Sequence, residues 1–420
     1  TAGIAGRVQP PDGNHLEEFG GDGGMRYTIG QLAEIIDGDR GKNYPKQDEF
    51  YPQGYCLFLN TGNVTKEGFI FEENQFIMKE KDEALRKGKL KRGDIVYTTR
   101  GTVGNAGYYN SSVPYENVRI NSGMVILRSN GEIVDARFLY QILKSEYYRP
   151  YFKQYCTGSA QPQLPIKNFS QIYLNVPDIK TQHRIADILS VYDNLIENNQ
   201  KQIKLLEEAA QRLYKEWFVD LRFPGHENTK IVDGVPEGWN EKTLSQVANV
   251  IMGQSPKSEF YNSEKKGLPF HQGVGSYGVR FVMDDIYSTS YTRIAEPNSI
   301  LFSVRAPVGR LNITKNKVVI GRGLAAINQT DGCQSYLYYL LKNKFFKDNI
   351  VGNGSIFASV SKDELLNQKF LIPERNLMMQ FEKIVSQMDK QIENLDSKNK
   401  RLIEARDRLL PKLMSGEVEV

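Results

Sequence analysis

The sequence predicts an α+β protein in which two globular mixed-sheet domains are separated by two long antiparallel helices that form a coiled coil. The first observation is a segment, 178–218, that contains no glycine or proline and carries an apolar heptad seam. The second is that the same pattern returns in 374–414. Globular sequence precedes each helix, so we expect one unit present twice, with internal pseudo-two-fold symmetry.

The first predicted helix is too long to cross one compact domain, since forty residues at 1.5 Å each span roughly 60 Å. A heptad seam is narrow and needs another helix to cover it. The two seams are Leu189, Tyr192, Ile196, Asn199, Ile203, Leu206, Ala210, Leu213 and Trp217, and then Val385, Met388, Ile392, Leu395, Asn399, Leu402, Arg406, Leu409 and Leu413.

The two helices also share surface residues that seam periodicity does not fix. The tripeptide Ile196-Glu197-Asn198 corresponds to Ile392-Glu393-Asn394. If the pseudo-axis lies near the middle of the helices, Asn199 and Asn399 come close together. Two buried amides there would set the register of the pair at some cost in stability.

Length and composition indicate a globular protein of several domains. The chain has 420 residues, 40% of them hydrophobic and 25% charged, which is ordinary for a globular protein of two to four domains. Its apolar runs are too short for a membrane span. The three cysteines are isolated and fit a reducing cytoplasm. A net charge of +4 neither requires nor excludes nucleic acid, because binding depends on a local patch.

The repeat divides the chain into segments. Glycine-rich residues 1–24 are expected to be a disordered leader or an expression remnant, with Met25 a possible original start. The other segments are a first globular domain (25–177), a helix (178–218), a linker (219–235), a second globular domain (236–373), a second helix (374–414) and a tail (415–420).

Motifs of enzymes are few. GVGSYG (273–278) matches G-x-G-x-x-G, but the residues after it, 279–282, are predicted to form a strand rather than the helix that a dinucleotide site requires. We therefore expect a loop there, with a nucleotide-dependent enzyme as a competing interpretation. The four histidines, His15, His183, His226 and His271, have no Cys or carboxylate at metal-ligand spacing.

Three motifs resemble those of the specificity subunits of type I restriction-modification systems. They are EWFVDLRFPG (216–225) after the first helix, GVPEGW (234–239) before the second domain, and LLPKLMSGEV (409–418) at the end. With the tandem architecture, the resemblance covers the chain from Met25 onward. One departure is that the first domain lacks a PEGW-like entry, which leaves its boundary less defined.

The resemblance implies a non-catalytic subunit that binds double-stranded DNA. Each globular domain would be a target-recognition domain that reads one half of a bipartite, asymmetric site, and the helices would set the distance between the halves. The partners implied are two methyltransferase subunits and, in the full complex, translocase-nuclease subunits. S-adenosylmethionine, ATP and Mg²⁺ would belong to those partners, so no cofactor is expected in this chain. A coiled-coil scaffold that does not bind DNA is the alternative.

DNA contacts require guanidinium or amide groups for base edges, and Lys, Ser or backbone N–H groups for phosphates. For each candidate Arg the alternative is a surface salt bridge, and for each Gln it is a hydrogen bond within the loop. The aromatic clusters 147–152 and 345–346 could stack on bases, but helical spacing favours the core. The candidates are Arg100, Arg119, Asn121, Ser122, Ser159, Gln161 and Gln163 in the first copy, and Arg305, Arg322, Ser355 and Ser359 in the second.

Overall fold

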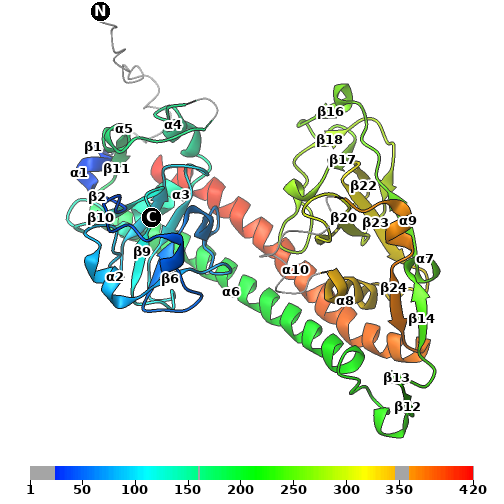
Figure 1. Ribbon diagram of the computed structural model, residues 1–420. Coiled ribbons are helices and arrows are strands. Elements are labelled where there is room, and N and C mark those ends of the chain that lie inside the picture. Colours follow the sequence, from blue (N-terminus) through cyan, green and yellow to red (C-terminus); the bar gives the residue numbers. More distant parts are fainter. Residues whose placement is uncertain (1–23, 159–160, 346–358, 420) are drawn as a thin grey trace, which may run out of the picture. The chain divides into compact units, whose positions relative to one another are not determined.

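The computed structural model describes residues 24–158, 161–345 and 359–419 (Figure 1). The chain forms two compact units, each discontinuous in sequence: unit 1 is 1–199 with 397–420, and unit 2 is 200–396. Each unit thus combines a globular domain with part of both long helices, so the units do not coincide with the segments expected from the sequence. The expected leader, 1–24, lies outside the described residues except for Gly24.

Among its described residues, unit 1 contains two sheets of three or more strands and two further strand pairs, β1-β11 and β4-β5. In the first, of order β2-β10-β7-β8, all pairs are antiparallel. In the second, of order β6-β3-β9, β3 and β9 are parallel, so the sheet is mixed. Helix α3 packs beside β7 and β8. The strands are β1 (Met25–Thr28), β2 (Ala33–Asp37), β3 (Cys56–Leu59), β4 (Val64–Thr65), β5 (Gly68–Phe69), β6 (Phe76–Ile77), β7 (Ile95–Thr98), β8 (Ala106–Tyr108), β9 (Val118–Ile120), β10 (Met124–Ser129) and β11 (Tyr173–Val176). The short helices are α1 (Ile29–Leu32), α2 (Lys79–Ala84), α3 (Ala136–Lys144), α4 (Arg149–Lys153) and α5 (Ile166–Ser170).

Unit 2 repeats this plan with more strands. An antiparallel sheet of order β15-β23-β20-β21 lies beside a mixed sheet, β16-β18-β17-β22-β19, in which β17 and β22 are parallel. Helix α8 packs beside β23. The strands are β12 (Ile231–Val232), β13 (Val235–Pro236), β14 (Asn240–Thr243), β15 (Ala248–Met252), β16 (Tyr261–Asn262), β17 (Leu268–His271), β18 (Tyr287–Ser288), β19 (Ile294–Ala295), β20 (Ile300–Ser303), β21 (Leu311–Ile313), β22 (Val318–Ile320), β23 (Leu324–Gln329) and β24 (Lys369–Ile372). The short helices are α7 (Leu244–Val247), α8 (Gln334–Phe345) and α9 (Lys362–Leu366).

Both globular domains contain the same helix-capping motif near their first residues. Thr28 and Thr243 each form a capping box with the glutamine three residues later, and in both cases the threonine N–H donates to the glutamine Oε1 over 2.8 Å. Each box satisfies backbone donors that the first helical turn leaves open. The short helix it starts then turns directly into the edge strand, β2 or β15.

The long helices are α6 (Ile179–Phe218) and α10 (Arg375–Met414). In unit 1, Asn199 contacts Asn399 and Asp193 contacts Arg406, so the helices run antiparallel there. In unit 2, Ile203 packs with Ile392 and Leu395, while Tyr214 meets Phe381, and the direction is again antiparallel. This agrees with the coiled-coil pair expected from the two seams.

Two expectations about loops and aromatic residues are also resolved. Residues 273–278 form a loop with one 3-10 turn, and the expected strand at 279–282 is reduced to isolated β-bridges because only Phe281 and Val282 find partners. No helix follows, so the loop lacks the dinucleotide-binding arrangement. Tyr148, Tyr151 and Phe152 are buried in the core of unit 1, as their helical spacing favoured. Tyr147 is exposed, Phe345 is partly buried against the core of unit 2, and Phe346 lies outside the described residues.

Candidate nucleic-acid interface

In unit 1, three polar segments that are distant in sequence meet where β7 ends. The backbone N–H groups of Thr99 and Arg100 donate to the carbonyl of Gly123, over 2.9 and 3.1 Å. The N–H of Leu164 donates to the Thr99 carbonyl over 2.9 Å, and Arg100 and Gln163 form a β-bridge. The structure therefore brings together the loops that carry Arg100, the turn 121–123 and Gln163.

Unit 2 builds the same junction with different side chains. The N–H of Val304 donates to Gly323 O over 2.9 Å, and the N–H of Val360 donates to Val304 O over 2.8 Å. Arg305 and Ser359 form the corresponding β-bridge. The repeat relation inferred from sequence thus extends to individual backbone hydrogen bonds. We call the two junctions recognition site 1 (Arg100, 121–123, 161–163) and recognition site 2 (Arg305, 321–323, 359–360).

The charged members of both sites are accessible. Arg100, Arg305 and Arg322 are exposed, and among the described residues their guanidinium groups have no hydrogen-bond or ion-pair partner. The surface salt bridges considered as alternatives are therefore not seen for these three. Gln161, Gln163 and Ser359 are exposed as well, whereas Asn121 and Ser122 are partly buried. Such guanidinium and amide groups can pair with base edges or phosphate oxygens.

Arg119, a candidate from the sequence, is placed differently. It is only 5% exposed, and its Nε lies 2.5 Å from Asp82 Oδ1. Its Nη1 and Nη2 donate to the carbonyls of Lys87 and Asp82, each over 2.7 Å. All three guanidinium nitrogens are thus used inside the domain, which argues against DNA contact. The repeat contained the signal for this, because Arg119 corresponds to Val319, a buried position in β22.

The buried ion pair of Asp82 with Arg119 stabilises the fold of the domain. Burial raises the pKa of Asp82, but hydrogen bonds and charge interactions with Lys89 and Arg119 outweigh burial and hold the pKa below its usual range. Asp82 is therefore ionised, and Arg119 ties α2 to β9.

The turn 121–123 is held from two sides. Asn121 Oδ1 accepts the N–H of Gly123 over 2.9 Å, so this amide shapes the turn. At Gly38, which follows β2, a Cβ atom would lie 2.3 Å from the Asn121 carbonyl oxygen. Gly253 stands in the same relation to Gly321 in unit 2, at 2.1 Å. Both glycines are needed because the backbones approach too closely for a side chain.

Three residues near the sites were not singled out from the sequence. Arg40 Nη2 donates to the carbonyl of Ser122 over 3.2 Å. Asn60 follows β3 and lies beside the turn 121–123, and Gln272 follows β17 and lies beside the turn 321–323, because these strands pair in parallel with β9 and β22. Gln272 is exposed, and its Oε1 accepts from Ser255 over 2.9 Å. The strands before Asn60 and Gln272 share a single residue, Phe58 in one and Phe270 in the other, so their equivalence is recognised mainly from their pairing with β9 and β22.

Two candidates, Ser159 and Ser355, lie outside the described residues.

Within the described ranges, no group of three or more His, Cys, Asp or Glu side chains is placed to hold a metal ion. Buried His271 instead lies 2.8 Å from Ser276 Oγ and 3.2 Å from Asp284 Oδ1, which fixes the loop after Gln272.

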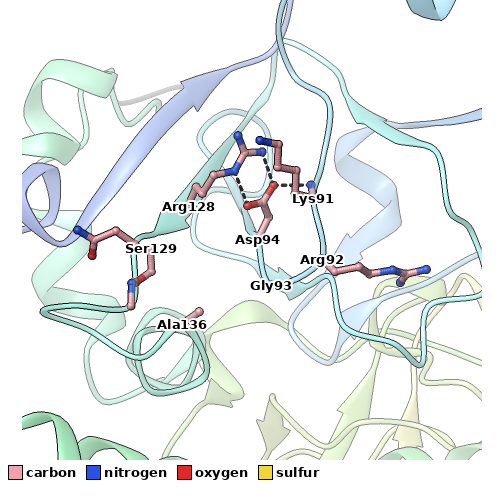
Figure 2. Close-up of a pocket in the computed structure, with 9 residues that line it drawn as sticks. Lys91, Arg92, Gly93, Asp94, Arg128, Ser129 and Ala136 are labelled. Carbon is pink, nitrogen blue, oxygen red and sulfur yellow. Dashed lines mark hydrogen bonds and ion pairs between the residues drawn. The ribbon is translucent and has the colours of Figure 1, made fainter.

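An open pocket of about 330 Å³ lies in unit 1 between the turn at 91–94 and the end of β10. Figure 2 shows Arg128 and Asp94 pointing toward one another, with Arg128 Nε and Nη2 at 2.9 and 2.7 Å from the carboxylate. The Lys91 N–H also donates to Asp94 over 2.7 Å. The Arg128 guanidinium and the Asp94 carboxylate thus satisfy each other rather than converge on a ligand.

No helix among the residues that the structure describes is both long enough and apolar enough to span a bilayer.

Comparison with known proteins places the chain in a family. The family model for the type I restriction modification DNA specificity domain matches residues 23–208 and again 236–405. The putative type I restriction enzyme MjaX specificity subunit of Methanocaldococcus jannaschii is 28% identical over 368 residues, covering 85% of this chain and 84% of its own. The HindI specificity subunit of Haemophilus influenzae is 26% identical, over 91% and 98% of the two chains.

A solved structure shows the same fold. The crystal structure of the type I restriction-modification system S subunit from M. genitalium aligns with 93% of this chain and 96% of its own, with a TM-score of 0.52 at 19% identity. The duplicated family match accounts for the two repeats found in the sequence. The chain therefore belongs to the type I restriction-modification DNA specificity family.

Proposed function

We propose that this chain is the specificity subunit of a type I restriction-modification enzyme and reads a bipartite, asymmetric DNA site, one half with each globular domain. Family membership gives it a non-catalytic role in DNA sequence recognition and does not favour the scaffold alternative. The observation that carries the bipartite proposal is the pair of recognition sites, which share backbone hydrogen bonds but differ in side chains.

The differences between the two sites support unlike half-sites. Asn121 and Ser122 in unit 1 correspond to Gly321 and Arg322 in unit 2, and Gln163 corresponds to Ser359. An arginine pairs best with guanine, whereas an amide pairs best with adenine. A symmetric protein dimer reads a palindrome. Because the scaffold here is repeated while the reading side chains change, the two halves of the DNA site are expected to differ.

We further propose how the segments divide the work. Residues 25–177 and 236–373 are the target-recognition domains, 219–235 is a linker, and 178–218 and 374–414 are spacer helices that set the distance between the half-sites. The family implies DNA and restriction-modification subunits as partners. Two methyltransferase subunits would dock beside the helix pair, with translocase-nuclease subunits in the full complex. S-adenosylmethionine, ATP and Mg²⁺ would be held by those partners, in the cytoplasm.

The test is to express the chain with its methyltransferase partner in a host that lacks other methyltransferases and to sequence the methylome. The expected result is one motif made of two different half-sites separated by unspecified bases. A palindromic or continuous motif would contradict the bipartite proposal. If the purified complex retained no DNA specifically, the scaffold interpretation would replace it. Equilibrium dialysis of the isolated chain against labelled ATP and S-adenosylmethionine should show no binding.

A further inference from the structure

We propose that two repeat-equivalent carboxylates, Asp193 on α6 and Asp389 on α10, are positioning residues that fix the orientation of each target-recognition domain on the helix pair. The inference rests on the proposed function, because the consequence of a fixed orientation is a preferred spacing between the half-sites. Asp193 and Asp389 occupy the same position in the two copies of the long helix.

In unit 1, the Asp193 carboxylate joins three helices. Its Oδ1 accepts from Lys144 Nζ over 2.6 Å and from Arg406 Nη1 over 2.9 Å, and its Oδ2 accepts from Gln141 Nε2 over 2.6 Å. Lys144 and Gln141 belong to α3 of the globular domain, while Arg406 belongs to α10. The side chains of Lys144 and Asp193 are 5% and 22% exposed, so the contact is largely shielded from water.

In unit 2, the domain supplies the cation from a loop instead of a helix. Arg280 Nη2 lies 2.6 Å from Asp389 Oδ1, and Arg280 Nη1 lies 3.4 Å from Glu207 Oε1 on α6. The Arg280 guanidinium stacks over the ring of Tyr338 at 3.8 Å, and its side chain is 2% exposed. One buried side chain of the domain therefore contacts both long helices.

These contacts fix the orientation of each domain on the helices more than they add net stability to the fold. Burial raises the pKa of Asp193, but the charges of Lys144 and Arg406 outweigh burial and keep the pKa below its usual range, so the carboxylate is ionised. A buried ion pair adds little net stability compared with a well-packed apolar pair, because desolvation offsets the attraction. Its hydrogen bonds do require particular angles and distances. Apolar packing alone would hold the domain on the helices with a less defined orientation.

The different cations of the two units fit this role. Since the carboxylate is kept at the repeat-equivalent position and the cation comes from α3 in one unit and from the loop 277–282 in the other, each domain has its own anchor geometry. A change at one anchor should therefore alter how one half-site is presented and leave the bases read by both sites unchanged.

The experiment uses the full chain in complex with its methyltransferase partner and measures methylation rates on duplexes with the native spacer and with one base pair more or fewer. Asp389→Asn removes the charge, and Asp389→Leu with Arg280→Met replaces the pair by apolar groups without leaving Arg280 buried alone. We expect the preference for the native spacer to fall about tenfold in both, since small misplacements of reacting groups cost rates of this order or more. Asp389→Glu should restore part of the preference.

The matched control is Glu241→Gln, which breaks the exposed ion pair with Lys369 in the same unit and should leave the spacer preference unchanged. If the double variant folds, as circular dichroism melting would show, and keeps the wild-type spacer preference, the positioning role is overturned. Altered half-site bases would overturn it too, because the anchor would then act on base reading. If the proposed function itself were wrong, the complex with the wild-type chain would already methylate a motif that has no spacer.

Discussion

Asn199 Nδ2 donates a hydrogen bond to Asn399 Oδ1 over 2.8 Å, which links α6 to α10 within unit 1. Asn399 is 7% exposed, and both amides lie at seam positions that apolar residues otherwise occupy. The close approach expected from the sequence is confirmed. An amide pair in an apolar seam favours one alignment of the helices, because any shift by a turn leaves both amides buried against apolar groups.

Replacing one of the two amides should lower the free energy of unfolding more than replacing both. Asn399→Leu leaves the Asn199 amide without its partner, and we expect a loss of about 1–3 kcal/mol in the free energy of unfolding. Asn199→Leu with Asn399→Leu should be close to neutral or stabilising, with a less defined helix register. Urea denaturation followed by circular dichroism measures both. A double variant less stable than either single variant would contradict a register role.

The helices were the most predictable part of the fold, and the reason is periodicity. Forty residues with one seam admit few other structures, and the second copy repeats the pattern with shared residues such as Glu197 and Glu393. The meeting of the loops that carry Arg100 and Arg305 with their neighbouring turns was predictable as a set of regions, since both arginines follow corresponding strands. The placement of individual side chains was not, because a side chain's direction depends on strand pairing that the sequence does not state. Arg119, a candidate, is buried in an ion pair, and Gln272, which lies beside the turn 321–323, was not singled out. Contact of the exposed candidates with DNA stays a prediction.

Arg100 and Arg305 should act on separate halves of the DNA motif. Arg100→Ala is expected to relax base preference only in the half read by unit 1, and Arg305→Ala only in the other half. Removing one bidentate hydrogen-bonded pair with a base costs about 1–3 kcal/mol of discrimination. Methylome sequencing, or competition with duplexes changed at single positions, provides the readout. Each variant is the control for the other.

A uniform loss of affinity across all sequences would assign these arginines to phosphates instead. In that case the dependence of binding on salt concentration should also become weaker, by roughly one unit of slope for each phosphate that the variant no longer neutralises.

Arg119 should act on stability and not on base preference. Arg119→Met leaves the Asp82 carboxylate buried with Lys89 as its remaining ion-pair partner, and breaking a buried pair in this way costs about 3–5 kcal/mol. The control is Glu83→Gln on the same helix, which breaks the exposed pair with Lys79 and should cost less than about 1 kcal/mol. Changed half-site bases in Arg119→Met would show that this residue contacts DNA after all.

The Asp82 pair also predicts a dependence of stability on pH. The folded-state pKa of Asp82 lies below its ordinary value of 3.8. Its contribution is therefore complete above that value and is lost as the pH falls from there through the folded-state pKa. The stability difference between wild type and Asp82→Asn should be constant from pH 7 to about pH 5 and should narrow below pH 4. A difference that persists unchanged at pH 3 would be inconsistent with an ionised Asp82.

Substitution of Gly253 tests whether the close approach of the two backbones shapes recognition site 2. In Gly253→Ala the new Cβ would lie 2.1 Å from the Gly321 carbonyl oxygen, so the turn 321–323 has to move. Forced overpacking of this kind costs about 1–3 kcal/mol, and we expect weaker discrimination in the second half-site alone. Gly273→Ala is the matched control, because no heavy atom lies within 4 Å of its Cβ position. Equal behaviour of the two variants in methylation assays would remove the turn from the site.

The spacer role of the helices predicts the effect of lengthening both together. One heptad inserted after Gln200 in α6 and another after Asp396 in α10 preserves the pairing of the seams, because both helices gain the same whole heptad close to the contact of Asn199 with Asn399. Seven residues add about 10 Å to each helix, which corresponds to about three base pairs at about 3.4 Å each.

The bases read in the two half-sites should stay the same. The spacer between them should grow, or methylation should be lost, because the added base pairs also rotate one half-site about the DNA axis. An insertion in α6 alone misaligns the seams and serves as the control for simple disruption. Efficient methylation of the original motif by the doubly extended chain would show that the helices do not set the spacing.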